Sequence, residues 1–292
     1  MLTRRLLLQS LFASAIASVG FADTRKTPLP DYINISYPKP EWQPASKGIE
    51  FARLDIRRNS EIIETIALMK VDPAHNQIRV FSSYEPSGKT MARTIEEWQK
   101  FTGASGMVNS AQYMADPFYM PCAPIICDGK WKGPKSNASV RGMLVAEPLK
   151  SGLPRADLLD FGFDHYAEGT YAQGVQHWPI LLDRTGNIKV KKSGWQANRT
   201  IVAKDTKGKI IFLTTEGSYF TLYNLAVFLK ENQALNVHTA MNLDGGSEAS
   251  MILKTKKVSY VRYGPYDETQ KDAFSLFSFK RKIPGVIGVF PR

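Results

Sequence analysis

The stretch that decides the fold is residues 238–251, with the sequence H-T-A-M-N-L-D-G-G-S-E-A-S-M. A short apolar run carried by Ala240, Met241 and Leu243 stops abruptly at Asp244, and two glycines follow. Glycine allows positive φ and lets another group approach the backbone closely. The stretch therefore predicts a buried strand that presents Asp244 at its C-terminal end, where α/β sheets place their ligands. An isolated Asp-Gly-Gly is typical of an ordinary tight turn. Only the rest of the chain distinguishes such a turn from a ligand-binding strand end.

The remainder of the chain shows strand patterns interrupted by two helical ones. Apolar residues at helical spacing predict helices over residues 90–101 and 221–232. Between residues 136 and 176 only one strand has a clear pattern, and no internal repeat is present. The sequence thus predicts one α/β (α+β) domain over residues 49–292, with a mixed β-sheet core and flanking helices. The predicted strands cover residues 49–56, 62–71, 77–82, 106–109, 125–127, 141–146, 179–182, 199–203, 210–215 and 285–290.

The N-terminus has the features of an export signal. Arg4 and Arg5 precede an uncharged run over residues 6–21, and small residues stand before a cleavage site after Ala22. Residues 1–22 are therefore predicted to be a signal peptide of the twin-arginine or Sec type, too short for a membrane span. Residues 23–48 contain five prolines and are predicted to form an extended arm. We expect a periplasmic or secreted mature protein without a transmembrane segment.

The net charge of +11 falls to +9 once the two arginines of the signal peptide are removed. A positive excess of this size favours anionic ligands or surfaces. The basic clusters at residues 189–192, 254–257 and 280–282 are predicted to be solvated turns or strand edges. No basic helix interleaved with aromatic residues is present, so a nucleic acid is not the expected partner.

Several kinds of site are excluded by the sequence. Neither nucleotide-binding fingerprint, G-x-x-x-x-G-K-[ST] or G-x-G-x-x-G, is present. Ser247 lies in a near match to the nucleophile elbow G-x-S-x-G, but that motif needs a histidine later in the chain. His75, His165, His177 and His238 all precede it, and His165 and His177 are expected to be hydrogen-bonded polar residues, not metal ligands.

The two cysteines, Cys122 and Cys127, are five residues apart. In an oxidising compartment they either form a disulfide or remain two small buried thiols, and their spacing does not decide between these states. Without neighbouring histidines they do not indicate a zinc site.

Polar side chains stand where several predicted strands end. Asn109, Glu216 and Asp244 each terminate an apolar run, and Arg199 begins one. One such residue is ordinarily part of a turn. If the strands are neighbours in a sheet, the four side chains converge and form a candidate site.

Over about residues 50–290, the sequence resembles the phosphodiester glycosidase family. The resemblance implies an enzyme that hydrolyses phosphodiester-linked sugars. The Met-Asn-Leu-Asp-Gly-Gly block is its most specific part, although the family commonly continues with a third glycine where this chain has Ser247. The matching blocks are residues 106–113, 124–130, 176–182, 198–200, 205–209, 216–217, 222–229 and 241–246.

The family resemblance implies a site for a sugar-1-phosphodiester. Cleavage of the sugar–phosphate bond expels a weakly basic phosphate monoester, so the site mainly needs cations on the phosphate and a carboxylate near the anomeric carbon. Asp244 is the expected nucleophile or base, with Glu216 or Glu248 as its catalytic partner. Arg199, together with Arg141, would clamp the phosphate. The remaining residues predicted to bind substrate are Asn109, Gln176, Thr200, Asn242, Gly245, Gly246 and Ser247.

Two other hypotheses remain open from the sequence. The protein could be a non-catalytic binding protein for anionic cell-envelope glycans that uses the same basic cleft. Alternatively, Asp244, Glu216 and Asn109 could supply oxygen ligands to calcium or magnesium. No EF-hand-like spacing supports a metal, so the expectation is an enzyme without a cofactor.

Overall fold

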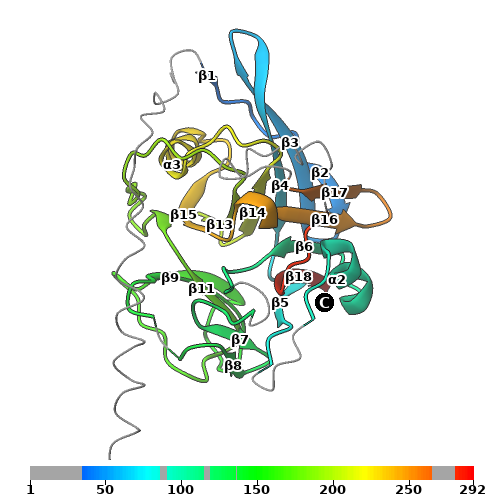
Figure 1. The fold of residues 1–292 in the computed structure, drawn as a ribbon, viewed down its shortest axis with the longest axis vertical. Helices are drawn as coiled ribbons and strands as arrows, with labels where there is room; N and C mark the ends of the chain where they lie inside the picture. Colours follow the sequence, from blue (N-terminus) through cyan, green and yellow to red (C-terminus); the bar gives the residue numbers. More distant parts are fainter. Residues whose placement is uncertain (1–34, 86–90, 115–118, 136, 265–279) are drawn as a thin grey trace, which may run out of the picture. The chain divides into compact units, whose positions relative to one another are not determined.

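The structure is a computed structural model that describes residues 35–85, 91–114, 119–135, 137–264 and 280–292. The predicted signal peptide and the first part of the predicted arm lie outside these residues. Three antiparallel sheets and two α-helices make up the described fold (Figure 1). The predicted mixed α+β class is confirmed, but the fold is richer in strands than α/β implies, because its sheets are antiparallel.

The largest sheet carries the strand that leads to Asp244. In this sheet β15 pairs with β13, and Asn242 lies opposite Ile201. β13 and β14 form the hairpin predicted from the sequence, and Asp205 closes its turn by accepting the N–H groups of Lys207 and Lys209 at 2.8 Å each. The order is β1 (Ile35–Ser36), β3 (Ile49–Arg58), β4 (Glu61–Val71), β14 (Ile210–Thr215), β13 (Thr200–Asp205), β15 (Val237–Asn242) and β12 (Ile180–Leu182), with β2 (Gln43–Ser46) paired to β3.

Two smaller sheets complete the fold. In the first, β9 and β11 are central, and in the second β6 lies between β16 and β18 (Figure 1). One has the order β10 (Ala156–Asp160), β9 (Gly142–Pro148), β11 (Tyr171–His177), β7 (Ile125–Cys127) and β8 (Lys130–Lys132); the other has β17 (Ser259–Tyr263), β16 (Ser250–Lys254), β6 (Gly106–Asn109), β18 (Gly285–Pro291) and β5 (Asn76–Ser82). The prediction missed β8, β10, β11, β16 and β17, and it assigned residues 35–48 to the extended arm, where β1 and β2 instead pair with β3.

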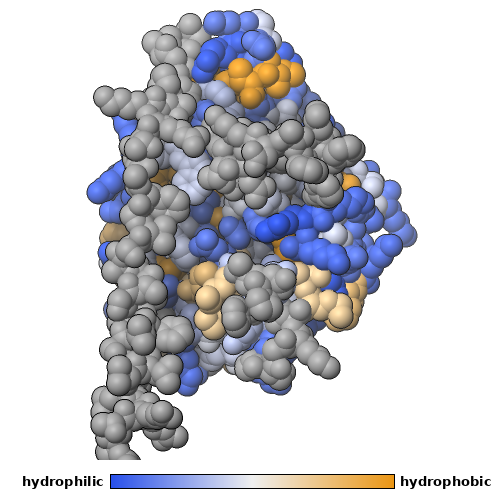
Figure 2. All heavy atoms as spheres, viewed as in Figure 1, coloured by the Kyte–Doolittle hydropathy of each residue, from blue (hydrophilic) through white to orange (hydrophobic). Residues whose placement is uncertain are grey.

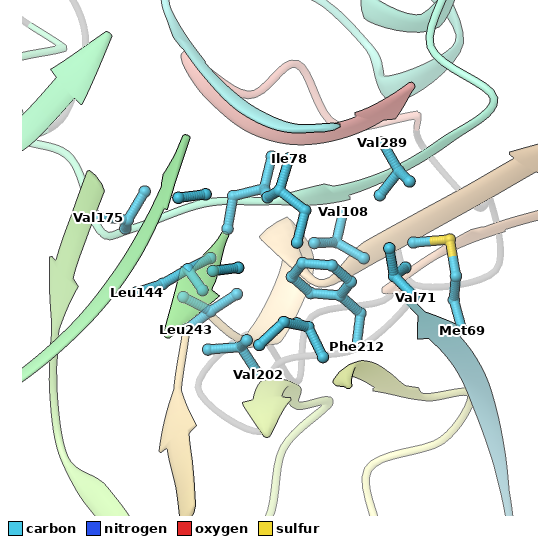
Figure 3. Close-up of a cluster of buried hydrophobic side chains, with 14 of the residues drawn as sticks. Met69, Val71, Ile78, Val108, Leu144, Val175, Val202, Phe212, Leu243 and Val289 are labelled. Atoms are coloured by element: carbon cyan, nitrogen blue, oxygen red, sulfur yellow. The ribbon is translucent and has the colours of Figure 1, made fainter. Parts of the chain in front are cut away.

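The main hydrophobic core lies where the three sheets meet. Figure 3 shows Phe212 and Val202 from the large sheet beside Leu144 and Val175 of one small sheet and Val108 of the other. All five side chains are buried. Burying one such side chain fully contributes about 1.5–3 kcal/mol, so this junction holds together the strand ends that carry the polar residues.

Threonine side chains fix where both helices begin. Thr94 accepts the N–H of Glu97 at 3.2 Å, and Glu97 in return accepts the N–H of Thr94 at 2.8 Å. This reciprocal cap starts α2 (Ile95–Thr102) at Ile95, five residues after the predicted start. Thr221 caps α3 (Leu222–Glu231) through the N–H of Asn224, so this helix begins close to its predicted position.

The structure also bears on the cysteines, on a membrane span and on the basic cluster at residues 254–257. Cys122 and Cys127 are free thiols. None of the helices in the described residues has the length and apolar character needed to cross a membrane. Lys254, Lys256 and Lys257 are exposed on the β16–β17 hairpin, over which Figure 2 shows mainly hydrophilic residues.

Candidate functional site

Asp244 follows the end of β15, and hydrogen bonds with other residues hold its backbone in place. Its N–H donates to the carbonyl oxygen of Ser110 at 3.1 Å, and its carbonyl oxygen accepts the Asn109 side-chain amide at 2.7 Å. The Asp244 carboxylate accepts the N–H of Gly245 at 3.0 Å. Backbone and carboxylate are therefore fixed independently, and the carboxylate lines a pocket of about 440 Å³, which we name the Asp244 pocket.

Asn109 joins two sheets beneath this carboxylate. The Asn109 side-chain nitrogen donates to the Asp244 carbonyl oxygen. Its side-chain oxygen, Oδ1, accepts the Thr200 hydroxyl at 2.7 Å and the N–H of Ser250 at 3.0 Å. The side chain is buried, and all its hydrogen bonds go to protein. The convergence predicted for Asn109 and Asp244 therefore occurs, and the side chains of Asn109 and Thr200 bind each other and the Asp244 backbone within the protein.

The two glycines after Asp244 are required by the local geometry. A Cβ atom on Gly245 would lie 2.8 Å from the carbonyl oxygen of Asn198, which is closer than real Cβ contacts come. Gly246 has φ of +63°, in the left-handed region, and its N–H donates to the same carbonyl oxygen at 2.8 Å. Both uses of glycine expected from the sequence are thus present. They allow the chain to turn into the short 3₁₀-helix η1 (Gly246–Glu248).

The turn brings a second carboxylate, Glu248, into the Asp244 pocket. Glu248 accepts the Ser247 hydroxyl at 2.8 Å and the Arg281 guanidinium at 3.0 Å. Burial and, to a smaller extent, the charge of Glu248 raise the pKa of Asp244, while the Gly245 N–H and the charge of Arg281 lower it, and the net result is a pKa of about 7. The pair therefore consists of one carboxyl that titrates near neutrality and one that is bound to a cation.

The pocket contains residues that the sequence analysis did not select. Arg281 and Lys282 belong to a basic cluster interpreted as a solvated turn, and nothing in the sequence links that cluster to Asp244. Tyr113 was noted only as part of a family block; burial raises its pKa. The full lining is Tyr113, Met114, Tyr119, Asp244, Glu248, Arg281, Lys282 and Pro284.

Arg199 and Asn242 lie next to the Asp244 turn without lining the pocket. The buried Arg199 side chain donates to the carbonyl oxygens of Trp195 at 2.8 Å and Phe220 at 3.4 Å, and passes 3.9 Å from the Cβ position of Gly245. Asn242 donates to the Trp178 carbonyl oxygen at 3.1 Å. Its own carbonyl oxygen lies 2.9 Å from Nδ1 of His177. Burial lowers the pKa of His177 to about 4, so this histidine is neutral at pH 7 and Nδ1 carries the donated proton.

Glu216 lies apart from the Asp244 pocket. Its carboxylate is held by Arg53 in a two-point ion pair at 2.8 and 2.9 Å and by the Tyr260 hydroxyl at 2.9 Å. Its backbone carbonyl oxygen accepts from Arg262 at 2.9 Å. A carboxylate with these partners has little capacity left for substrate, so the arrangement favours Glu248 over Glu216 as the partner of Asp244.

Replacing Glu216 by Gln tests this distinction. We expect turnover to stay within about threefold of the wild type and stability to fall by no more than about 1 kcal/mol, because ion pairs with an exposed partner contribute little. Arg53 is 53% exposed in this pair. Steady-state kinetics and a denaturant titration measure the two quantities. A loss of turnover as large as that caused by changing Asp244 would return Glu216 to the catalytic set.

Arg141 and Gln176 line a different pocket, on the sheet of β9 and β11, and share no lining residue with Asp244. The two residues are brought together there, but not with Arg199. The hypothesis of a metal bound by Asp244, Glu216 and Asn109 also lacks a common site, because the oxygens of Glu216 and Asn109 are engaged elsewhere. Among the described residues, no three or more His, Cys, Asp or Glu side chains are grouped to hold a metal ion.

Comparison with known proteins adds to this geometry. A model of the phosphodiester glycosidase family matches residues 102–290. The fold is similar to the catalytic domain of zebrafish N-acetylglucosamine-1-phosphodiester α-N-acetylglucosaminidase, auto-inhibited by its pro-peptide, with 18% identity, a TM-score of 0.61 and 89% of each chain covered. It is also similar to a hypothetical protein from Synechocystis, with 14% identity, a TM-score of 0.60, and 87% of this chain and 64% of that one covered. At these identities, the structural similarity establishes the fold alone. No curated protein matches the sequence.

Proposed function

The chain belongs to the phosphodiester glycosidase family, and we propose that it hydrolyses the bond between the anomeric carbon of a sugar and a phosphate oxygen. One observation carries the proposal. An enclosed carboxyl with a pKa of about 7, Asp244, shares a pocket with the cation-bound carboxylate Glu248. A pair of carboxyl groups in one pocket, one of them with a raised pKa, is typical of acid–base and nucleophilic catalysis on sugars.

The chemistry of the leaving group assigns the roles. A phosphate monoester is a weak base, so it leaves without needing a general acid, and the main barrier is attack on the anomeric carbon. Asp244 would act as the base that activates water, or as the nucleophile itself. Glu248, oriented by Ser247, would stabilise positive charge on the sugar, while Arg281 and Lys282 would bind the phosphate.

The substrate class is proposed on two grounds. The zebrafish relative is named for its action on N-acetylglucosamine-1-phosphodiesters, and a chain of net charge +11 favours a ligand with a phosphate. The predicted signal peptide supports action outside the cytoplasm, in the periplasm or after secretion, on a sugar-1-phosphodiester or a related envelope glycan.

Turnover is the deciding experiment. Residues 23–292 are incubated with a panel of sugar-1-phosphodiesters, and free sugar and phosphate monoester are measured, with the Asp244→Asn variant in parallel. We expect both products with the wild type and neither with the variant. Saturable binding of the panel without any product would instead support a non-catalytic glycan-binding protein.

The pH dependence of kcat/KM tests the assignment of Asp244. As base or nucleophile it must be ionised, so the rate should rise with pH through a midpoint near 7, set by its raised pKa. Because Glu248 raises this pKa and Arg281 lowers it, Glu248→Gln should move the midpoint to lower pH and Arg281→Gln to higher pH. A rate that falls above pH 7 would make Asp244 a general acid, and midpoint shifts in the same direction would contradict the pairing.

A further inference from the structure

The sheet of β9 and β11 carries a second pocket, of about 620 Å³, larger than the Asp244 pocket and with no lining residue in common. We propose that this pocket, between Trp131, Arg141, Tyr166 and Gln176, binds a sugar residue of the substrate beyond the bond that is cleaved. We name it the distal pocket. The inference rests on the proposed function only in taking the ligand to be a glycan.

Two aromatic side chains form one wall of the distal pocket. The rings of Trp131 and Tyr166 have centroids 5.9 Å apart and lie at 79° to each other. Both are partly exposed, so this edge-to-face pair keeps part of its surface open. The C–H face of a pyranose ring is apolar and packs against such surfaces. An aromatic wall with a few fixed polar groups is typical of small-molecule pockets.

Gln176 supplies a fixed hydrogen-bond acceptor. Its side-chain nitrogen donates to the carbonyl oxygens of Val140 at 2.6 Å and Asn137 at 3.3 Å, which fixes the orientation of the amide. The residue is 6% exposed. Within the described residues Oε1 accepts no hydrogen bond, and it is not among the side-chain atoms sealed off from solvent. A buried amide oriented in this way presents Oε1 to a hydroxyl donor, which a sugar provides.

Arg141 supplies hydrogen-bond donors to the distal pocket. The guanidinium lies over Gly162, where a Cβ atom would be 2.9 Å from Nη2. Among the described residues Arg141 takes part in none of the ion pairs. Its planar donors are therefore available to two neighbouring acceptors at once. A donor, an acceptor and an aromatic wall together match the alternating hydroxyl groups and C–H face of a pyranose.

A short segment, residues 121–124, connects the two pockets. Pro121 pairs with Tyr113, which lines the Asp244 pocket. The carbonyl oxygen of Cys122 accepts the Asn137 amide at 3.1 Å, and that of Pro124 accepts the N–H of Gln176 at 3.0 Å. Asn137 and Gln176 line the distal pocket. The segment therefore contacts lining residues of both pockets, and the proposal places the chain of the glycan along it.

The test is a binding titration on the Asp244→Asn protein, which should bind without cleaving. The probes are tetrasaccharides of N-acetylglucosamine, of glucose, and of alternating N-acetylglucosamine and glucuronic acid. We expect at least one to bind, and Arg141→Gln or Tyr166→Ala to weaken its binding at least tenfold. Gly162→Ala, which displaces the guanidinium without removing it, should also weaken binding. Arg155→Gln is the matched control, because Arg155 precedes β10 on the same sheet, is exposed and does not line the pocket.

Turnover then separates this inference from the proposed function. With Asp244 intact, Tyr166→Ala should raise KM for sugar-1-phosphodiesters extended by further sugars, and leave kcat/KM for single-sugar substrates unchanged. Failure of every tetrasaccharide to bind, or equal binding by all variants, would overturn the distal pocket even if single-sugar substrates are cleaved. Binding that depends on Arg141 in a protein without turnover would retain the pocket and overturn the proposed function.

Discussion

Replacing Asp244 by Asn is expected to lower kcat by a factor of about 10²–10⁴, the usual contribution of a catalytic acid or base. Asn is close in size and retains an oxygen that can accept the Gly245 N–H, so the turn after β15 should form as before. What the variant lacks is a group that ionises near pH 7. The change is measured by steady-state kinetics on a sugar-1-phosphodiester.

Stability against pH provides the control for this variant. The folded pKa of Asp244, about 7, is above its ordinary value of 3.8, so the folded state binds the proton more tightly. Its contribution to stability is therefore complete below pH 3.8 and is lost as the pH rises towards 7. At about 1.4 kcal/mol per pKa unit, the loss has an upper bound of about 4 kcal/mol. Asn does not titrate, so the stability of the variant relative to the wild type should increase over this pH range. At pH 8 the variant should therefore unfold at a higher denaturant concentration than the wild type. Full turnover by a stably folded variant would remove Asp244 from the mechanism.

Replacing Asn109 by Ala should destabilise the fold by at least about 3 kcal/mol. Three buried groups lose their partner: the Asp244 carbonyl oxygen, the Thr200 hydroxyl and the Ser250 N–H. Each buried polar group left without a hydrogen bond costs about 1–3 kcal/mol. Urea or guanidinium unfolding, with an unchanged m-value, measures the loss.

Thr200→Val is the matched comparison for Asn109. It removes one of these bonds and keeps the side-chain shape, so a loss of about 1 kcal/mol is expected. If Asn109→Ala lowered stability no more than Thr200→Val, the link between the two sheets would contribute little to stability. Asn109 would then not be what holds the Asp244 turn in place.

Sequence patterns predicted the fold best where burial and polarity coincide. The β13–β14 hairpin has apolar strands and a turn closed by Asp205, so local chemistry determines it. β11 was missed because Gln173, Gln176 and His177 are buried in it. Gln173, for example, accepts the N–H of Val80 at 2.9 Å from another strand. When buried positions carry polar side chains whose partners are distant in sequence, the strand shows neither apolar–polar alternation nor an apolar run. The sequence pattern that identifies a strand is then absent.

The site was predicted in part for a similar reason. Asp244 and its two glycines are adjacent in sequence, and their geometry follows from the local chain. Glu248 was included because it follows directly, but its cation Arg281 is 33 residues away in a basic cluster that resembles many solvated ones. Asn109 and Thr200 were predicted to bind substrate; the structure shows Asn109 bound to the Asp244 carbonyl oxygen and to the Thr200 hydroxyl. Sequence order shows which residues end strands, while only the packed sheets show which way their side chains face.

The Asn109 junction also determines when the site can form. Asn109 and the Asp244 carbonyl oxygen that it binds are 135 residues apart, and Ser250 is 141 residues from Asn109. Contacts between such distant segments form only after a large loss of chain entropy. During folding, the carboxylate therefore acquires its final position only after β16 has packed beside β6. A chain that ends before β16 lacks the Ser250 N–H that binds Asn109, so the link that holds the Asp244 turn is incomplete.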